Sequence, residues 1–385
     1  MEQTHLATDR SLSVQQVAAR LGVTPVTVYR HLRRGTLPHF RFGGTLRVLE
    51  TDLDAFIQRG RRHGVSPIPP ERANVPTANT LPQRSRAWAE LVRPSSWTAS
   101  LVPVLLGTAI AWKDGHLNPI LVGLALVGAT LLHAATNVIN ELFDVRQGVD
   151  AVESAGGSKM VAQARLLPGE VYKGGLLLFG MAVLVGAYLA TVRGYYIVLV
   201  GTAAVLAGYF YTAPPFHYKY RALGVPVVLV MMGPLMVLGT YFVMTGTVTA
   251  QAVLASIPVG VLVASIFHAK DIRDVENDAR AGSTTLATLM GQRSAGRLYT
   301  VMTFGCYAIT VLLVALRTLP AWSLITLLAL LVAMPASLHM ERGTRPQGGP
   351  TLALAAIDTA TVRHHLLFGV LLSIAFVLQR ATSSW

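Results

Sequence analysis

Acidic side chains gather in two short clusters after position 80, although acids are otherwise sparse there. Eight of the thirteen acids in this part of the chain belong to the clusters. They are Glu141, Asp144, Asp150 and Glu153 in the first, and Asp271, Asp274, Glu276 and Asp278 in the second. Each cluster directly follows a long apolar segment. Ionisable groups beside a hydrophobic span are costly and by default indicate function.

The two clusters are a repeat, because an offset of 134 residues (271 − 137) places one on the other. The matched positions are Asn137 with Asp271, Asn140 with Asp274, Asp144 with Asp278, Arg146 with Arg280 and Gly148 with Gly282. Residues at i, i+3 and i+7 share one face of a helix. The spacing therefore predicts two helix ends that each present a stripe of oxygen ligands across a shared cavity.

These stripes offer carboxylate and amide oxygens without His or Cys, a set that suits Mg²⁺ better than zinc. Protein-bound Mg²⁺ is usually completed by substrate phosphate, so the pattern predicts a Mg²⁺-bridged diphosphate. The predicted metal ligands are Asn140, Asp144, Asp271, Asp274 and Asp278. Solvated loop charges and channel-type cation binding are the alternatives. Acids at helix ends, rather than at mid-membrane depth, argue against a channel or transporter.

Basic residues lie near both clusters, where a departing diphosphate would need positive charge. Lys159 follows the first cluster, and Lys270 and Arg273 are interleaved with the second. Lys219 and Tyr211 belong to the short loop sequence YTAPPFHYKYRALG. The simpler interpretation of each basic residue is a positive charge on a cytoplasmic loop.

The composition supports a polytopic membrane protein, because 52% of the residues are hydrophobic and only 13% are charged. Nine apolar segments of spanning length are predicted. They lie near 95–112, 118–143, 170–192, 195–213, 222–245, 249–269, 295–316, 320–339 and 362–379. With the N-terminus inside, the inner loops after residue 83 hold seventeen Lys and Arg against four outside. We therefore expect a multi-pass protein of the bacterial cytoplasmic (inner) membrane with a cytoplasmic N-terminus.

Residues 1–62 predict a small separate domain with the element order of a winged helix-turn-helix. Ser13 and Gln16 form a capping box for a first helix that stops at Gly22, and a second helix ends at Gly35. The sequence HFRFGGTLRVLE predicts a hairpin, followed by a third helix. Residues 63–86 are a Pro-rich linker, and residues 87–385 hold the predicted nine-helix domain.

The N-terminal segment resembles excisionase/MerR-like DNA-binding modules through VQQVAARLGVTPVTVYRHLRRGTLP, RFGGTLRV and DLDAF. The resemblance implies a recognition helix and a wing that contact DNA. The implied contact residues are Thr24, Thr27, Tyr29, Arg30, Arg33, Arg41 and Arg47. Eleven Arg against six acids in residues 1–80 give a net charge of +5, which suits phosphate contacts. The alternative is an inherited module now used for protein contact.

From about residue 88 onward the chain resembles the UbiA superfamily of intramembrane aromatic prenyltransferases. The specific elements are NVINELFDVRQGVD, YTAPPFHYKYRALG and KDIRDVENDARAGSTTLATLMG. The likeness is strongest to the 1,4-dihydroxy-2-naphthoate polyprenyltransferases of the menaquinone branch. Two positions depart from that branch: Glu141 stands where it usually has Asp, and Lys270-Asp271 stands where it tends towards Asn-Asn.

The resemblance implies transfer of a polyprenyl group from its diphosphate to an aromatic acceptor. The metal-diphosphate would be bound by the predicted ligands, with Asn137, Glu141 and Asp150 as further substrate-binding residues. Lys159, Lys219, Lys270 and Arg273 would stabilise the released diphosphate, with Tyr211 nearby. The apolar helices would hold the prenyl tail in a groove open to lipid.

Residues that could be mistaken for further site residues are expected to be structural. We expect His133 to be a hydrogen-bonded interior histidine rather than a base, and Met231, Met232 and Met236 to pack rather than bind. Two other functions stay open: a UbiA-type enzyme with another aromatic or lipid acceptor, and a membrane-tethered DNA-binding regulator that senses a quinone or lipid. Two intact acidic motifs favour the enzyme, because a sensor has no need of them.

Overall fold

The structure is a computed structural model in which the chain divides into two compact units. One unit comprises residues 1–87 with 159–167, and the other comprises 88–158 with 168–385. The residues that the structure describes are 10–23, 28–29, 31–32, 35–42, 45–62, 81–147, 160–161, 165–343 and 357–383.

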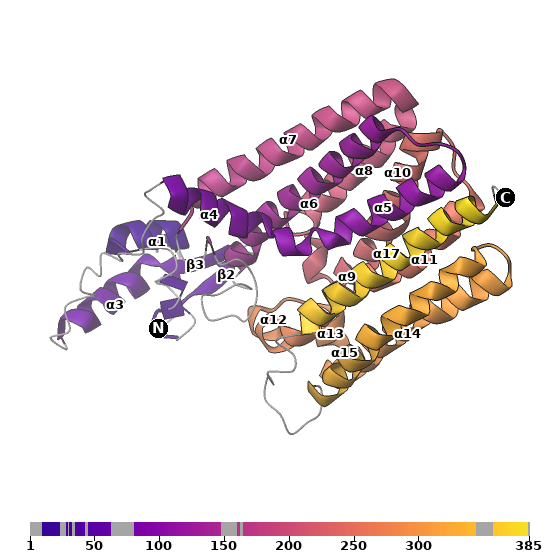
Figure 1. Ribbon diagram of the computed structural model, residues 1–385. Coiled ribbons are helices and arrows are strands. Elements are labelled where there is room, and N and C mark those ends of the chain that lie inside the picture. Colours follow the sequence, from indigo (N-terminus) through magenta and orange to yellow (C-terminus); the bar gives the residue numbers. More distant parts are fainter. Residues whose placement is uncertain are drawn as a thin grey trace. The chain divides into compact units, whose positions relative to one another are not determined.

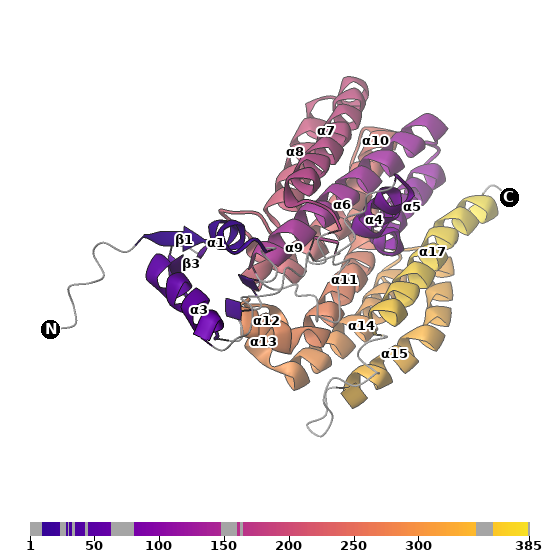
Figure 2. The same ribbon diagram turned by 90° about the vertical axis from the view of Figure 1, so that its left-hand side faces the viewer.

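The described residues of the N-terminal unit include a three-stranded antiparallel sheet and two helices beside it (Figure 2). The strands, in the order β1-β3-β2, are β1 (Ser11–Ser13), β2 (Phe40–Phe42) and β3 (Thr45–Leu49), and the helices are α1 (Val14–Leu21) and α3 (Glu50–Arg62). The capping box is confirmed: Gln16 N donates to Ser13 Oγ at 3.3 Å, and Ser13 N donates to Gln16 Oε1 at 2.8 Å. Gly22 ends α1 with φ 66°, a conformation that glycine adopts without strain. The predicted hairpin is confirmed as β2 and β3.

The second unit is a bundle of long apolar helices (Figure 1). Its first half contains α4 (Leu81–Val92, which begins in the N-terminal unit), η1 (Pro94–Ser96), α5 (Thr98–Lys113), α6 (Pro119–Gln147), α7 (Pro168–Arg193), α8 (Tyr195–Phe210) and η2 (Tyr218–Tyr220). Its second half contains α9 (Gly224–Val230), the π-helical η3 (Met231–Leu235), α10 (Met236–Thr245), α11 (Ala250–Arg273), α12 (Val275–Ala281), α13 (Leu286–Met290), α14 (Gln292–Ala315), η4 (Ala321–Ala329), α15 (Leu330–Gly343) and α17 (Ile357–Ser383).

The count of nine spans is not confirmed. Among the described residues, seven helical segments are long and apolar enough to cross a membrane. An eighth results if α5 is joined to the helix before it, across a bend of 51°. The remaining predicted segment corresponds to α8, which has 16 residues and is shorter than a typical span. The helices follow the predicted apolar segments, but length and composition alone do not make all nine into spans.

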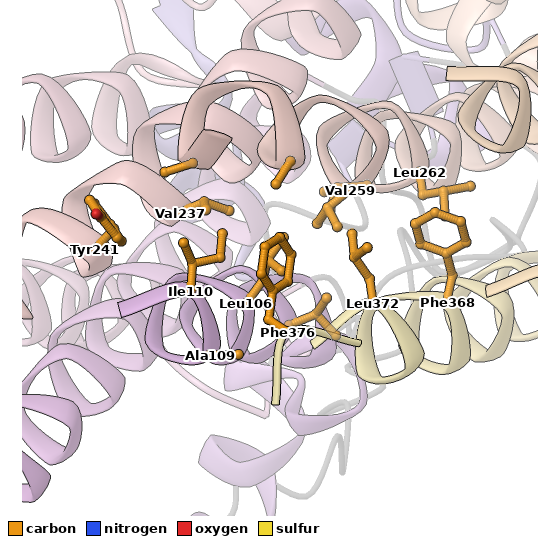
Figure 3. Close-up of a cluster of buried hydrophobic side chains, with 14 of the residues drawn as sticks. Leu106, Ala109, Ile110, Val237, Tyr241, Val259, Leu262, Phe368, Leu372 and Phe376 are labelled. Carbon is orange, nitrogen blue, oxygen red and sulfur yellow. The ribbon is translucent and has the colours of Figure 1, made fainter. Parts of the chain in front are cut away.

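The bundle core lies where α5, α10, α11 and α17 meet (Figure 3). Leu106 and Ile110 of α5 face Val259 of α11 and Phe376 of α17, and all four side chains are buried. Small residues let the backbones approach: a Cβ added to Gly233 would lie 2.5 Å from the Cα of Gly260 on α11. Close small-residue contacts are typical of helix packing in membranes, where apolar burial alone does not drive association.

Candidate active site

The ends of α6 and α11 carry the two acidic motifs, and Lys219 of η2 contacts the first of them. Lys219 Nζ donates to both carboxylate oxygens of Asp144, at 2.5 and 2.7 Å, and to Asn140 Oδ1 at 3.2 Å. The Tyr220 hydroxyl donates to Asp144 Oδ1 at 2.7 Å. Asp144 is fully buried and Lys219 is 9% exposed, so this is a desolvated ion pair held by additional hydrogen bonds.

The loop that carries Lys219 is tied to the segment after the second motif. Lys219 N donates to Tyr211 O at 3.0 Å, so the loop folds back on the end of α8. Ala222 N donates to Thr284 O at 2.7 Å, and Thr284 N donates to Tyr220 O at 3.2 Å. These backbone bonds fix Lys219 and Tyr220 beside both motifs.

The second motif turns a corner at Asp274, where α11 ends and α12 begins. Arg273 holds the Asp274 carboxylate with two hydrogen bonds of 2.9 and 2.7 Å and also pairs with Asp358 of α17. Asp278, one turn further on, is 5% exposed. The Asp271 and Asp278 carboxylates receive no hydrogen bond or ion pair from the described residues.

The electrostatic surroundings of Asp278 connect the two motifs. Burial raises the pKa of Asp278 to about 6, the carboxylates of Asp274 and Asp144 add to the rise, and the ammonium groups of Lys219 and Lys270 oppose it. Asp144 belongs to the first motif, so charges from both halves of the repeat act at one place.

Two predicted substrate-binding residues of the first motif contact the connection between α4 and α5. Arg93 Nη2 donates to Glu141 Oε2 at 2.9 Å, and Glu141 is fully buried. Asn137 Nδ2 donates to Val92 O at 3.1 Å and to Ser96 Oγ at 3.2 Å. The contacts seen for these two residues are therefore structural. The predicted residues Asp150 and Lys159 lie outside the described residues.

A pocket of about 120 Å³ opens beside Asn140, between α5, α6, α8, η3 and α11. Its wall includes Ser100, His133, Asn137, Tyr211 and Phe267. A second, larger pocket of about 350 Å³ is almost wholly apolar and runs between α6, α7, α8 and α10. Both are lined by Leu132, Ala204, Met231 and Met236, so the two pockets are neighbours.

Some residues around this pocket were not predicted as site residues. Met231, Met232 and Met236 line it, and Met232 also packs against the hydrophobic core, so the packing role expected of these methionines stays a prediction. His133 is a hydrogen-bonded interior histidine, as expected. Tyr220 and Ser100 were missed. Tyr220 adjoins Lys219 in the sequence, but no spacing rule could have selected either residue.

The donor set of the acidic motifs fits a hard cation. The five predicted ligands offer only carboxylate and amide oxygens, and the raised pKa of Asp278 indicates that its charged form lacks compensation. Within the described residues, no group of three or more Asp, Glu, His or Cys side chains lies close enough together to hold one metal ion.

In the N-terminal unit the structure describes few of the predicted DNA contacts. Tyr29 is half-buried and packs against the domain core, and Arg47 lies half-buried in β3. Arg41 belongs to β2, but its side chain is outside the described residues. The other four, Thr24, Thr27, Arg30 and Arg33, also lie outside the described residues.

The second unit is an all-helical membrane bundle with buried acidic side chains at its helix ends. Comparison with known proteins shows the family to which the chain belongs. The chain belongs to the UbiA prenyltransferase family, whose model matches residues 100–348. A helix-turn-helix domain model matches residues 11–61.

Relatives and solved structures agree with this family. A 1,4-dihydroxy-2-naphthoate octaprenyltransferase of Bacillus subtilis (strain 168) is 30% identical over 312 residues, covering 80% of this chain and 98% of the relative. The UbiA prenyltransferase domain-containing protein 1 of Homo sapiens is 30% identical over 318 residues, covering 80% and 90%. The structure of a UbiA homologue from Aeropyrum pernix K1 has a TM-score of 0.55 at 15% identity, covering 73% of this chain and 97% of that one, and shows the shared fold.

Proposed function

We propose that this protein transfers a polyprenyl group from its diphosphate to 1,4-dihydroxy-2-naphthoate, the aromatic step of menaquinone biosynthesis. One observation carries the proposal. The buried Lys219 ammonium donates hydrogen bonds to Asp144 and Asn140 of the first motif, and its charge also opposes the rise in the pKa of Asp278 in the second. Cation and carboxylates are thus gathered at the mouth of an apolar pocket, where a diphosphate head and a prenyl tail could bind together.

The acidic motifs would hold Mg²⁺ with the diphosphate, through Asn140, Asp144, Asp271, Asp274 and Asp278. Bound Mg²⁺ supplies neutralisation of the charge that develops on the diphosphate. Lys219 and Lys270, whose charges act at Asp278, would place positive charge beside the diphosphate oxygens. Arg273 and Lys159 are proposed as further cations that stabilise the released diphosphate. As the allylic C–O bond breaks, its electron pair goes to the diphosphate, and the aromatic ring attacks the allylic carbon. With dihydroxynaphthoate as the acceptor, the ring regains its aromaticity as the bond to its carboxylate breaks and releases CO₂.

The apolar pocket would take the prenyl tail. Its lining is almost wholly hydrocarbon, including Gly128, Gly186, Gly201 and Gly239, and these small residues leave room beside the helices. Exclusion of water here would protect the allylic cation from hydrolysis. Leu132 and Ala204 line both this pocket and the smaller one, so the reacting carbon would lie beside these two residues.

The choice of acceptor is supported by the Bacillus subtilis relative, which is named for 1,4-dihydroxy-2-naphthoate. The test uses membranes containing the full-length protein, supplied with Mg²⁺ and octaprenyl diphosphate. Dihydroxynaphthoate, 4-hydroxybenzoate and a panel of other phenols serve as acceptors. We expect prenylated product from dihydroxynaphthoate first. Prenylation of another ring alone would move the protein to another branch of the family, and no product from any ring would overturn the function.

A second function is proposed for the N-terminal module, because the helix-turn-helix match covers residues 11–61. We propose that it binds DNA on the cytoplasmic side of the cytoplasmic membrane, through Thr24, Thr27, Tyr29, Arg30, Arg33, Arg41 and Arg47. Selection of bound fragments from random duplex DNA, using detergent-solubilised full-length protein, tests this. Enrichment of one sequence, lost in Arg30→Ala/Arg33→Ala, is expected. Equal retention of all sequences would favour a protein-contact module.

A further inference from the structure

The polar end of the small pocket carries a chain of hydrogen bonds that no part of the diphosphate chemistry uses. It links Ser96 of η1 and Ser100 of α5 with His133 and Asn137 of α6. Ser100 is fully buried, His133 is 7% exposed, and both line the pocket. Buried polar groups that face a cavity in this way can orient a ligand.

The direction of each bond in this chain is fixed by its partners. Asn137 Nδ2 contacts the carbonyl of Val92, so this atom is the amide nitrogen and must also donate to Ser96 Oγ. The one hydroxyl proton of Ser96 goes to Arg93 O at 2.8 Å, because a carbonyl can only accept. Ser96 Oγ is therefore an acceptor towards His133.

It follows that His133 carries its proton on Nε2 and donates it to Ser96 Oγ at 2.9 Å. In the neutral ring Nδ1 is then an acceptor, and among the described residues the Ser100 hydroxyl, at 2.7 Å, is the only group bonded to it. The Ser100 hydroxyl donates its proton to His133 Nδ1, and the lone pairs of its oxygen can accept a hydrogen bond from a ligand in the pocket. This wall of the pocket is therefore a hydrogen-bond acceptor.

We propose that Ser100 Oγ receives the hydroxyl of the aromatic acceptor, and that His133 is the positioning residue that keeps Ser100 in the accepting orientation. A hydroxylated ring can donate this bond, whereas the corresponding quinone or ether cannot. The pocket thus selects the reduced, hydroxyl-bearing form of the ring. This inference rests on the proposed function, and it assigns the residue and the ring group that meet.

The position of Ser100 suits this role. The pocket extends from Ser100 to Asn140, whose Oδ1 accepts from Lys219 beside Asp144, and Leu132 lines both this pocket and the apolar one. A ring held at Ser100 would lie between the diphosphate-binding groups and the tail pocket. A hydrogen bond to Ser100 would also increase electron density in the ring that attacks the allylic carbon.

The test pairs a change in the protein with a change in the ligand. Binding of 1,4-dihydroxynaphthalene and of its dimethyl ether to purified full-length protein is measured anaerobically by equilibrium dialysis. We expect the wild type to prefer the diol by about tenfold, the value of one hydrogen bond to a buried group. Ser100→Ala and His133→Phe should both reduce the preference to less than about twofold. Ser256→Ala is the matched control, since this buried serine of α11 bonds only Val253 O of its own helix.

The outcomes separate the inference from the function. An unchanged preference in both Ser100→Ala and His133→Phe, or no preference in the wild type, overturns the inference even if prenyl transfer occurs. A preference that disappears in both variants supports it, even if no ring in the acceptor panel is prenylated. A purely structural role for His133 predicts equal weakening of both ligands in His133→Phe, with the preference kept, and this result too would contradict the proposal.

Discussion

The two acidic motifs share one register but differ in how their charges are compensated. In the first, Asp144 is bonded by Lys219 and Tyr220, and Glu141 is paired with Arg93. In the second, Asp274 is held by Arg273, whereas Asp271 and Asp278 receive no ion pair from the described residues. The first motif therefore contributes to the fold through its ion pairs, and the second keeps carboxylates whose charge calls for an added cation.

Removing one carboxylate from each motif gives the largest expected effects and tests this difference. Asp144→Ala and Asp278→Ala should each lower prenyl transfer by at least about 100-fold, because each removes charge stabilisation at the diphosphate. Only Asp144→Ala leaves the buried Lys219 without its carboxylate, so only this variant should lower the thermal unfolding temperature. Glu276→Gln, which changes an exposed carboxylate of α12, is the control and should keep its activity. Full turnover in either alanine variant would sink the ligand assignment.

Because the charge of Asp278 is uncompensated, neutralising this side chain should raise the unfolding temperature, whereas removing Asp144 should lower it. Burial raises the pKa of Asp278 to about 6, so folding favours its protonated form, and the cost of the charged form grows as pH rises from about 4 through about 6. Without Mg²⁺, Asp278→Asn should therefore unfold at a higher temperature than the wild type at pH 7.5. Added Mg²⁺ should stabilise the wild type more than the variant. Equal responses to Mg²⁺ would mean that Asp278 does not bind the ion.

Lys219→Met tests the compensation of charge in the first motif, because it removes the ammonium group and keeps a side chain of similar volume. It leaves Asp144 buried without a counter-ion, and breaking a buried pair costs about 3–5 kcal/mol. We expect a lower unfolding temperature, measured in detergent, that Mg²⁺ partly restores. We also expect a higher KM for the prenyl diphosphate. An unchanged unfolding temperature would show that the Lys219–Asp144 pair does not stabilise the fold.

A smaller effect is expected at Glu141, where the sequence departs from its menaquinone relatives. The structure pairs Glu141 with Arg93, so Glu141→Asp should lower stability by about 1 kcal/mol through a poorer contact across α4 and α6. The KM for the prenyl diphosphate should stay at its wild-type value. A changed KM with unchanged stability would instead support the predicted substrate-binding role of Glu141.

The motif repeat, the capping box, the hairpin and the apolar segments could all be predicted because they depend on residues close together in the chain. The contacts that distinguish the two motifs could not. Arg93 meets Glu141 across 48 residues and Lys219 meets Asp144 across 75, and helix packing rather than spacing decides such pairs. The number of spans could not be predicted either, because α8 is short and α5 is joined to the helix before it across a bend of 51°.

The smallest effect is expected from deleting residues 1–80, which compares the N-terminal module with the membrane unit. The family match begins at residue 100, and both acidic motifs lie beyond it, so every residue of the proposed chemistry is retained. Because a domain with its own core can fold separately from the rest of the chain, prenyl transfer should stay within about twofold of the full-length value. Size-exclusion chromatography of the truncated protein confirms folding before the assay. A well-folded truncation without activity would make the N-terminal module part of the enzyme, and DNA binding alone would no longer explain its presence.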